Sequence, residues 1–218
     1  FSAVLPSLFS RYEFETAHHL NIDYTTRQQE PSLQQLQPIV NNADPLNIFI
    51  GNPKLKPEYI HELNASYLMY DQFTFTSVFG RLGASIEKNK IADNIFIDSL
   101  ARRTIQPVNI SNEKNINGSI EFGAPIKPLK VTTKVRYRNQ LTKSQLYING
   151  ETDNTTRLNH SLNFTVENRN KNKVDVLTGY KWSSNNTTHS LDDNWNQKFI
   201  EHNLFGEVSI TLSDNWDF

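Results

Sequence analysis

Apolar and polar residues alternate with a period of two along most of this chain. Between Leu158 and Glu167 the even positions carry Leu, His, Leu, Phe and Val, and the odd positions carry Asn, Ser, Asn, Thr and Glu. The stretch from Ile200 to Leu212 repeats this pattern. Successive side chains of a β-strand point to opposite faces, so the alternation predicts strands with one apolar and one polar face.

Helical periodicity is almost absent, and the alternation predicts an all-β chain of about nine strands. They cover residues 8–14, 20–24, 59–69, 73–86, 116–122, 129–138, 158–167, 174–182 and 200–212. The fourth strand changes phase near residues 77–80, which indicates a β-bulge there. Several of these segments reach ten or more residues, whereas strands of globular proteins commonly have about 5–6.

The connectors between these strands are of two kinds, which alternate. Short connectors stand at residues 16–17, 71–72, 124–128, 168–172 and 214–215, and long polar ones at 28–57, 92–103, 142–154 and 184–197. Tight turns at one end and long loops at the other are typical of an antiparallel up-and-down β-barrel in the outer membrane, with its loops outside the cell.

Strand length agrees with a membrane-spanning wall. About eleven residues at roughly 3.3 Å each, tilted near 45°, cover the apolar band of about 25 Å. A soluble sandwich or lipocalin-like barrel has the same period, with its apolar face turned inward. Alternation by itself therefore leaves a soluble β-rich binding module open.

Composition excludes several other classes. The 218 residues carry a net charge of −1 and contain no cysteine, so we expect no nucleic-acid partner, no disulfide and no thiolate metal site. Mean hydropathy is −0.58, and no stretch is apolar enough for a membrane-spanning helix. The chain opens with Phe1 in mid-pattern, without a signal peptide, and we expect it to be a section of a longer barrel.

Four motifs in the first 60 residues carry a resemblance to a known family. They are Arg27-Gln28-Gln29-Glu30-Pro31, Leu33-x-x-Leu36-x-Pro38, Asp44-Pro45-Leu46, and Gly51-Asn52-Pro53-x-Leu55-x-Pro57-Glu58. Together they resemble the barrel region of TonB-dependent receptors of the Bacteroidota type. The later strands match that family only as a pattern.

The resemblance implies a function and a set of partners. Receptors of this kind import a metal chelate, glycan, peptide or vitamin across the cell outer membrane of a Gram-negative bacterium. Residues 1–218 would then be part of a transmembrane barrel of 22 strands, in contact with outer-membrane lipid. The plug domain, the remaining strands and the segment that meets an inner-membrane TonB-type energising complex would lie outside this chain, and a surface lipoprotein is a further expected partner. A non-transporting barrel that anchors such a lipoprotein or serves a secretion apparatus is the alternative.

The motif from Gly51 to Glu58 predicts a rigid extracellular connector with a structural role. Its residues are Gly51, Asn52, Pro53, Leu55, Pro57 and Glu58. The prolines fix their own φ and hold the preceding residues extended, while glycine can take the geometry that a turn requires. We expect an ordered loop over the mouth or wall of the barrel, followed by a strand that begins at Pro57-Glu58.

A row of cations is the candidate functional feature of the polar face. Lys130, Lys134, Arg136 and Arg138 recur at even positions of one predicted strand. Adjacent cations in a barrel lumen need either carboxylate partners or an anionic solute. Glu121, Glu167 and Glu201 are the partners that the sequence offers, and a role in the passage of an anionic substrate is the alternative.

Histidines complete the set of candidate residues. His61, His160 and His202 recur as His-x-Leu on the apolar faces of three strands, a pattern that predicts an amphipathic girdle at the lipid headgroups. His18 and His19 are neighbours on a strand and so point to opposite faces, which argues against a shared metal ion. No catalytic or cofactor-binding motif is found, so we expect neither an enzyme nor a cofactor.

Overall fold

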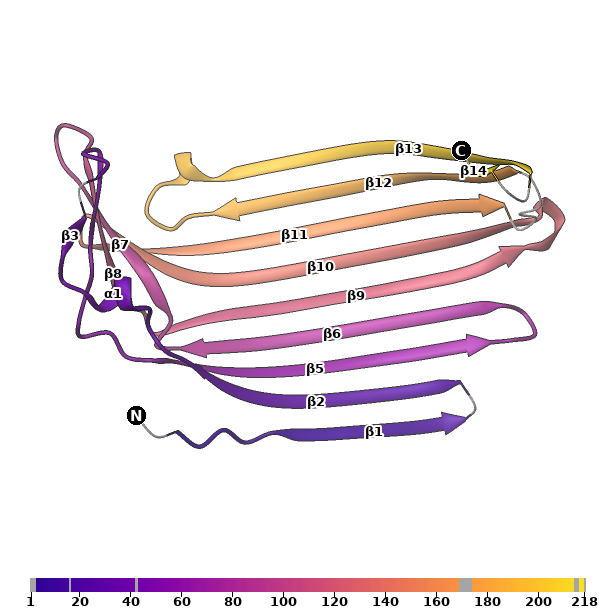
Figure 1. The fold of residues 1–218 in the computed structure, drawn as a ribbon, viewed down its shortest axis with the longest axis horizontal. Coiled ribbons are helices and arrows are strands. Elements are labelled where there is room, and N and C mark those ends of the chain that lie inside the picture. Colours follow the sequence, from indigo (N-terminus) through magenta and orange to yellow (C-terminus); the bar gives the residue numbers. More distant parts are fainter. Residues whose placement is uncertain (1–2, 16, 42, 169–173, 214–215, 218) are drawn as a thin grey trace.

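The computed structural model describes residues 3–15, 17–41, 43–168, 174–213 and 216–217, and these form one broad sheet of long strands (Figure 1). The strands pair in the order β1 (Leu8–Glu15), β2 (His18–Gln29), β5 (Glu58–Asp71), β6 (Thr76–Lys88), β9 (Asn112–Ile126), β10 (Val131–Ile148), β11 (Glu151–Asn168), β12 (Val174–Thr188), β13 (Gln197–Ser213) and β14 (Trp216–Asp217). Spatial order follows chain order and every pair on this path is antiparallel. The path is therefore an up-and-down meander, as the sequence predicts.

The sheet is open within the described residues. β1 pairs only with β2 at one edge, and β13 is followed by the two-residue strand β14 at the other. An exposed edge strand leaves backbone N–H and C=O groups unpaired. Within the described residues β1 and β13 do not pair, so these strands do not close into a small barrel.

Two long connectors carry strands of their own, which the sequence analysis does not predict. β3 (Val40–Asn41) and β4 (Asn47–Ile50) lie between β2 and β5, after the short helix α1 (Leu33–Leu36), and β7 (Ile91–Ile97) and β8 (Arg103–Asn109) lie between β6 and β9. β4 pairs with β8 in parallel, and β7 pairs with both β8 and β10. The two connectors thus form one small sheet at the loop end of the wall, at the left of Figure 1.

The predicted long loop at residues 142–154 is wrong. β10 continues to Ile148 and β11 starts at Glu151, so only Asn149 and Gly150 connect them. Both have positive φ, 51° and 84°, which is the type I′ geometry that Asn-Gly favours in two-residue hairpins. The alternation of short and long connectors is therefore broken at this hairpin. The connector predicted at 184–197 is shorter than expected, because β12 continues to Thr188 and β13 begins at Gln197. The connector contains the short 3₁₀ helix η2 (Asp193–Trp195), and a second one, η1 (Lys127–Leu129), lies between β9 and β10.

The predicted β-bulge in the fourth strand is also wrong. The register between β5 and β6 runs without a shift from Tyr59 opposite Lys88 to Asp71 opposite Thr76. Phe75 has φ of 58° and belongs to the preceding turn. The change of phase in the sequence marks the point where the turn ends, because the aromatic residues before Thr76 lie outside the strand.

Unbroken registers from β2 to β13 assign every wall residue to one of two faces. Leu158, Leu162, Phe164, Ile200, Leu204, Val208 and Ile210 share one face, which we call the apolar face. Six of these seven side chains are at least 37% exposed, and Leu158 is half-buried. They do not form a closed core, since the buried apolar side chains among the described residues are Leu55, Ile60 and Ile110 at the loop end.

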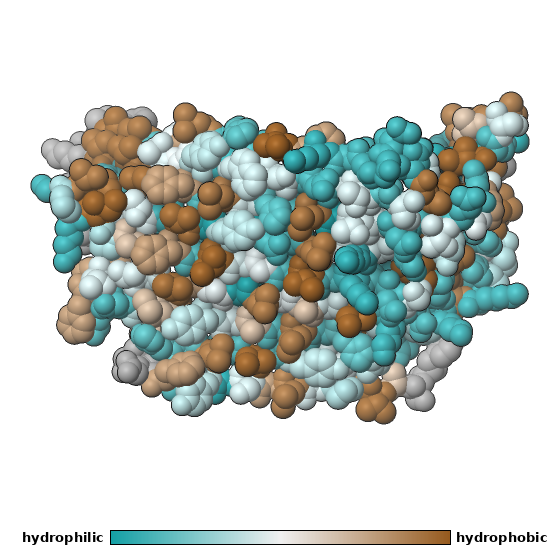
Figure 2. Space-filling view, turned by 180° about the vertical axis from the view of Figure 1, so that it is seen from behind, coloured by the Kyte–Doolittle hydropathy of each residue, from teal (hydrophilic) through white to brown (hydrophobic). Residues whose placement is uncertain are grey.

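Figure 2 shows one face of this sheet, with apolar side chains over the middle and the short-turn end of the strands and hydrophilic ones gathered toward the loop end. Among the described residues no helix is long and apolar enough to cross a membrane.

Candidate functional site: the polar face and the loops above it

The cation row lies on the polar face, opposite carboxylates of the two neighbouring strands. Arg136 forms an ion pair with Glu121 of β9, and Lys134 lies 3.2 Å from Glu167 of β11. The structure thus brings together two of the predicted partners with two of the predicted cations. These pairs neutralise half of the row.

The other two cations of the row, Lys130 and Arg138, do not form ion pairs among the described residues. Lys130 is not on the strand: it caps η1 with φ of 53°, in the left-handed region, because the chain turns there before β10. Arg138 forms no ion pair among the described residues, and it lines a hollow of the polar face together with Lys181 and Glu201.

The Gly-Asn-Pro motif is held by hydrogen bonds to both long connectors. The Asn52 backbone N–H donates to the carbonyl of Gln35 at 2.6 Å, and its side-chain amide donates to the carbonyl of Pro107 in β8 at 3.0 Å. Asn109 accepts from the backbone N–H of Lys56 and donates to its carbonyl, at 2.8 and 2.9 Å. These contacts join the motif to the β7–β8 hairpin.

Gly51 is required by space. A Cβ atom built at this residue would lie 2.1 Å from the carbonyl oxygen of Gln37 and 2.8 Å from that of Gln34, closer than any side chain tolerates. Leu55 is buried next in the chain, and β5 begins at Glu58, as the sequence predicts. The connector is packed because its backbone runs against the turn after α1.

Glu58 fixes the base of the small loop sheet. Its carboxylate is buried and accepts a hydrogen bond from the backbone N–H of Ile91 at 2.7 Å. Lys90 lies 3.8 Å from Glu58 and 2.6 Å from Glu87. Burial lowers the pKa of Lys90, but the hydrogen bond and charge of Glu87 outweigh it, so that this pKa lies above its ordinary value. Lys90 is therefore charged when it joins the two carboxylates.

A pocket of about 520 Å³ lies between β7 and the polar face of the wall. Pockets that bind small molecules commonly enclose about 300–1,000 Å³. The lining includes carboxylates from β6, β7 and β9, amides and hydroxyls from β9 and β10, and one guanidinium from β11: Glu87, Asp93, Glu113, Asn115, Gln140, Thr142 and Arg157. These groups suit a ligand with many hydrogen-bonding atoms.

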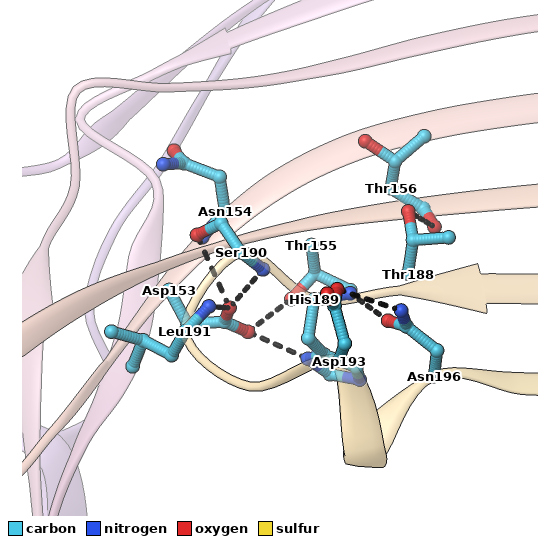
Figure 3. Close-up of polar contacts among 10 residues, drawn as sticks. All are labelled: Asp153, Asn154, Thr155, Thr156, Thr188, His189, Ser190, Leu191, Asp193 and Asn196. Carbon is cyan, nitrogen blue, oxygen red and sulfur yellow. Dashed lines mark hydrogen bonds and ion pairs between the residues drawn. The ribbon is translucent and has the colours of Figure 1, made fainter.

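Asp153 anchors the connector between β12 and β13 to the wall (Figure 3). Its carboxylate is fully buried, lies 2.6 Å from Nδ1 of His189, and accepts from the backbone N–H groups of Ser190 at 2.8 Å and Leu191 at 3.1 Å. Burial raises the pKa of Asp153. The hydrogen bonds from His189, the two N–H groups and Thr155 together lower it by more, so that this pKa lies below its ordinary value. The carboxylate stays ionised and holds the connector down.

Three tyrosine–histidine pairs cross neighbouring strands of the apolar face. The hydroxyl group and Nδ1 lie 2.8 Å apart in Tyr24–His61, 2.7 Å in Tyr137–His160 and 2.6 Å in Tyr180–His202. In each pair the tyrosine stands opposite the leucine of the His-x-Leu motif. Each tyrosine is also the sixth residue after the first residue of its strand. The pairs thus lie at one height above the short turns.

Residues on the apolar face change character at the height of these pairs. Below them lie residues such as Ile22, Val135 and Val176. Above them stand one further apolar row, Ile116, Leu141 and Leu158, and then mostly polar residues such as Gln28 and Lys143. Amphipathic rings stand at such a boundary in membrane proteins. Sequence reasoning missed the tyrosine partners of these three histidines, because only the strand register brings each pair together.

Comparison with known proteins settles the class of this wall. The model of an outer-membrane protein β-barrel family matches residues 1–213. The chain belongs to this family. No curated protein matches it.

Membership in the outer-membrane barrel family indicates what each face of the sheet contacts. In such barrels the outward face meets lipid and the inward face lines the lumen. We therefore infer that the apolar face of this barrel wall meets lipid and that the polar face, with its ion pairs and the pocket beneath β7, lines the lumen. Sequence reasoning missed that pocket and Asp153, because both depend on how the connectors fold back onto the wall.

Proposed function

We propose that this barrel wall belongs to a TonB-dependent receptor of the Bacteroidota type, which imports a small polar nutrient such as a metal chelate, glycan, peptide or vitamin. The polar pocket beneath β7 carries the proposal. It lies on the polar face at the loop end, and its lining offers both donors and acceptors. In the proposal this face lines the lumen, so a ligand arriving from outside would first meet the barrel here.

The loops around the pocket support a binding role. Their backbone is fixed by the β4–β8 and β7–β10 pairings and by Asn52, Asn109 and Glu58. A binding site held by rigid elements loses little entropy when it takes up a ligand. The two ion pairs of the cation row are consistent with a polar, uncharged nutrient, because they neutralise two of the four cations of that row.

In this proposal the open sheet continues into a larger barrel, of 22 strands by the resemblance, with a plug domain and an inner-membrane energising complex as partners. The test is uptake by cells of a Gram-negative host that carry the full-length protein, with candidate ligands supplied as the limiting nutrient. We expect uptake to disappear when the energising complex is deleted. Uptake that persists without the complex contradicts the proposal.

Arg157 gives the test at residue level, because it is the one guanidinium of the pocket lining. Charge-assisted hydrogen bonds contribute about 1.5–3 kcal/mol, so Arg157→Ala should weaken ligand binding by about tenfold or more. Arg102→Ala is the control, since Arg102 pairs with Asp98 in the hairpin turn outside the pocket. Equal losses in the two variants would contradict a binding role of the pocket.

A non-transporting barrel that holds a surface lipoprotein is the second candidate. One observation favours it: apolar side chains of the first long connector lie exposed at the loop end, namely Leu33, Ile39, Val40 and Leu46. Exposed apolar clusters mark surfaces that bind other proteins. Co-purification of a lipoprotein with the wild type, together with no energised uptake of any nutrient, would favour this candidate.

A further inference from the structure

Lysines on the apolar face form a pattern that the import proposal does not use. Lys88, Lys114, Lys143 and Lys198 all lie on this face, near the loop ends of β6, β9, β10 and β13, and all four are exposed. Among the described side chains of the wall strands from β2 to β13, Asp71 is the only carboxylate on this face, and it lies at the short-turn end. The loop-end rim of the apolar face is therefore positive.

Two of these lysines stand directly opposite each other. Lys114 of β9 pairs in register with Lys143 of β10, and Lys88 of β6 stands opposite Asn112, the residue two positions from Lys114. Directly opposed side chains have Cβ atoms about 4.5–5.5 Å apart, and like charges at this spacing repel. None of the three forms an ion pair within the part of the chain that the structure describes. An anion between them would remove this repulsion.

A hollow of about 350 Å³ lies at this position. Its lining joins the two opposed lysines to hydroxyl and amide groups and contains no carboxylate: Ser111, Asn112, Lys114, Lys143, Ser144, Gln145, Asn154, Thr155 and Thr156. Gln145 accepts a hydrogen bond from Ser111 at 3.1 Å and donates one to Asn154 at 2.9 Å. These contacts fix the side of the hollow and leave the ammonium groups and the amide of Asn112 as donors.

The height of the hollow matches the headgroup layer. Lys143 lies four residues beyond Asn139, which stands opposite His160. Four residues of a strand tilted near 45° rise about 9 Å along the membrane normal. On β10 and β11 the apolar band ends at Leu141 and Leu158, two positions above His160, and Lys143 is the next residue of β10 on this face. The hollow therefore lies just above the hydrocarbon, facing away from the lumen.

We propose that this hollow binds a phosphate group on the headgroup of an outer-leaflet lipid. The charge of the site, its donors and its position on the lipid-facing surface are complementary to such a phosphate, and a soluble nutrient would meet the opposite face. Lys114 and Lys143 hold the phosphate, Asn112 donates to it, and Lys88 adds a third charge nearby. The site adjoins the pocket beneath β7, with which it shares Ser144, Gln145 and Thr155 in the lining, but its two lysines come from the opposite face of the sheet.

The test measures binding of a fluorescent lipid A with two phosphates to the full-length protein in detergent micelles. The double variant K114Q/K143Q should bind it about 30-fold more weakly than the wild type, because each lysine near an anionic surface contributes about 1 kcal/mol. The wild type should bind dephosphorylated lipid A about as weakly. K54Q/K56Q removes two exposed lysines of the loop and should bind like the wild type.

Two further measurements separate the alternatives. Inorganic phosphate should displace the lipid only weakly, and displacement at concentrations similar to those of lipid A would show a site for free phosphate and overturn the proposal. Bound lipid A should raise the thermal unfolding temperature of the wild type and of a charge-keeping K143R variant, but not that of K114Q/K143Q. Equal stabilisation of all three would also overturn it, as would equal lipid affinity of K114Q/K143Q and the wild type.

Discussion

The hydroxyl of Tyr137 in β10 lies 2.7 Å from Nδ1 of His160 in β11. Tyr137 stands opposite Leu162, and His160 lies two positions from Leu162 toward the loop end. The same diagonal relationship recurs in Tyr24–His61 and Tyr180–His202. At the corresponding place on β6 and β9 stand Leu82 opposite Gly118, with Ile116 two positions above. Four strand pairs are joined at the loop end, namely β2–β5, β6–β9, β10–β11 and β12–β13. Three of them thus carry a polar contact between two rings near the upper end of their apolar band.

Removing this contact should destabilise the wall. Tyr137→Phe leaves Nδ1 of His160 without its partner, and we expect a loss of about 1 kcal/mol in the free energy of unfolding, measured in lipid vesicles by denaturant titration. Tyr67→Phe on the same face is the matched control, because no hydrogen bond of its hydroxyl is found among the described residues. If the two variants lose the same stability, the Tyr–His contact contributes nothing.

Gly51→Ala should loosen the first long connector. The new Cβ would lie 2.1 Å from a backbone oxygen that cannot move aside cheaply, and such overpacking costs about 1–3 kcal/mol. We expect faster hydrogen exchange at Asn52 and Leu55, whose N–H groups are hydrogen-bonded in the folded loop. Gly80→Ala serves as control, since nothing lies within 4 Å of its Cβ position. Unchanged exchange in Gly51→Ala would refute the close packing.

The connector between β12 and β13 should detach in acid. The folded-state pKa of Asp153 lies below the ordinary value of 3.8, so its stabilisation is complete above that value and is lost as the pH falls through the lower folded-state pKa. Hydrogen exchange at Ser190 and Leu191 should therefore accelerate at low pH. Asp153→Asn should remove this pH dependence and cost about 2 kcal/mol, whereas Asp193→Asn should keep it. The same pH dependence in Asp153→Asn would exclude Asp153 as the anchor.

The ion pair of the cation row can be tested by reversal. Arg136→Glu places a second carboxylate beside Glu121, and we expect a loss of up to about 1 kcal/mol, because the pair is partly exposed. The reversed pair, Glu121→Arg with Arg136→Glu, should recover most of that loss. Heat-modifiable gel migration in detergent gives the measurement. No recovery in the reversed pair would mean that the contact does not depend on charge.

The strands of the wall could be predicted from the sequence because each of them carries apolar residues on one face and polar residues on the other. Alternation placed Leu162 and Leu204 on one shared face and the start of β5 at Glu58, and the strand register confirms both. The Asn149-Gly150 dipeptide is itself a hairpin signal. The residues around it do not alternate, because Leu146, Tyr147 and Ile148 form an apolar run before the turn and polar residues follow it, so the pattern predicts a loop where β10 and β11 in fact continue.

The candidate site could be predicted only in part. Alternation put Arg136 and Glu121 on one face, but it could not tell which cation would meet which carboxylate, because that depends on the register. β7 and β8 escaped prediction because they are held by pairing with β4 and β10 rather than by a period of their own. Asp153 looks like any loop carboxylate until the connector folds over it.

The central claim is that the apolar face of this wall meets lipid and the polar face meets water. The chain contains no cysteine, so single cysteines at each residue from Leu158 to Val166 can carry a spin label in the full-length protein in vesicles. Collision rates with oxygen and with a water-soluble nickel chelate then report the surroundings of each position. We predict a period of two, with oxygen favoured at Leu162 and Phe164 and the chelate favoured at Ser161 and Asn163. Equal accessibility at even and odd positions, or the reverse order, would contradict the account.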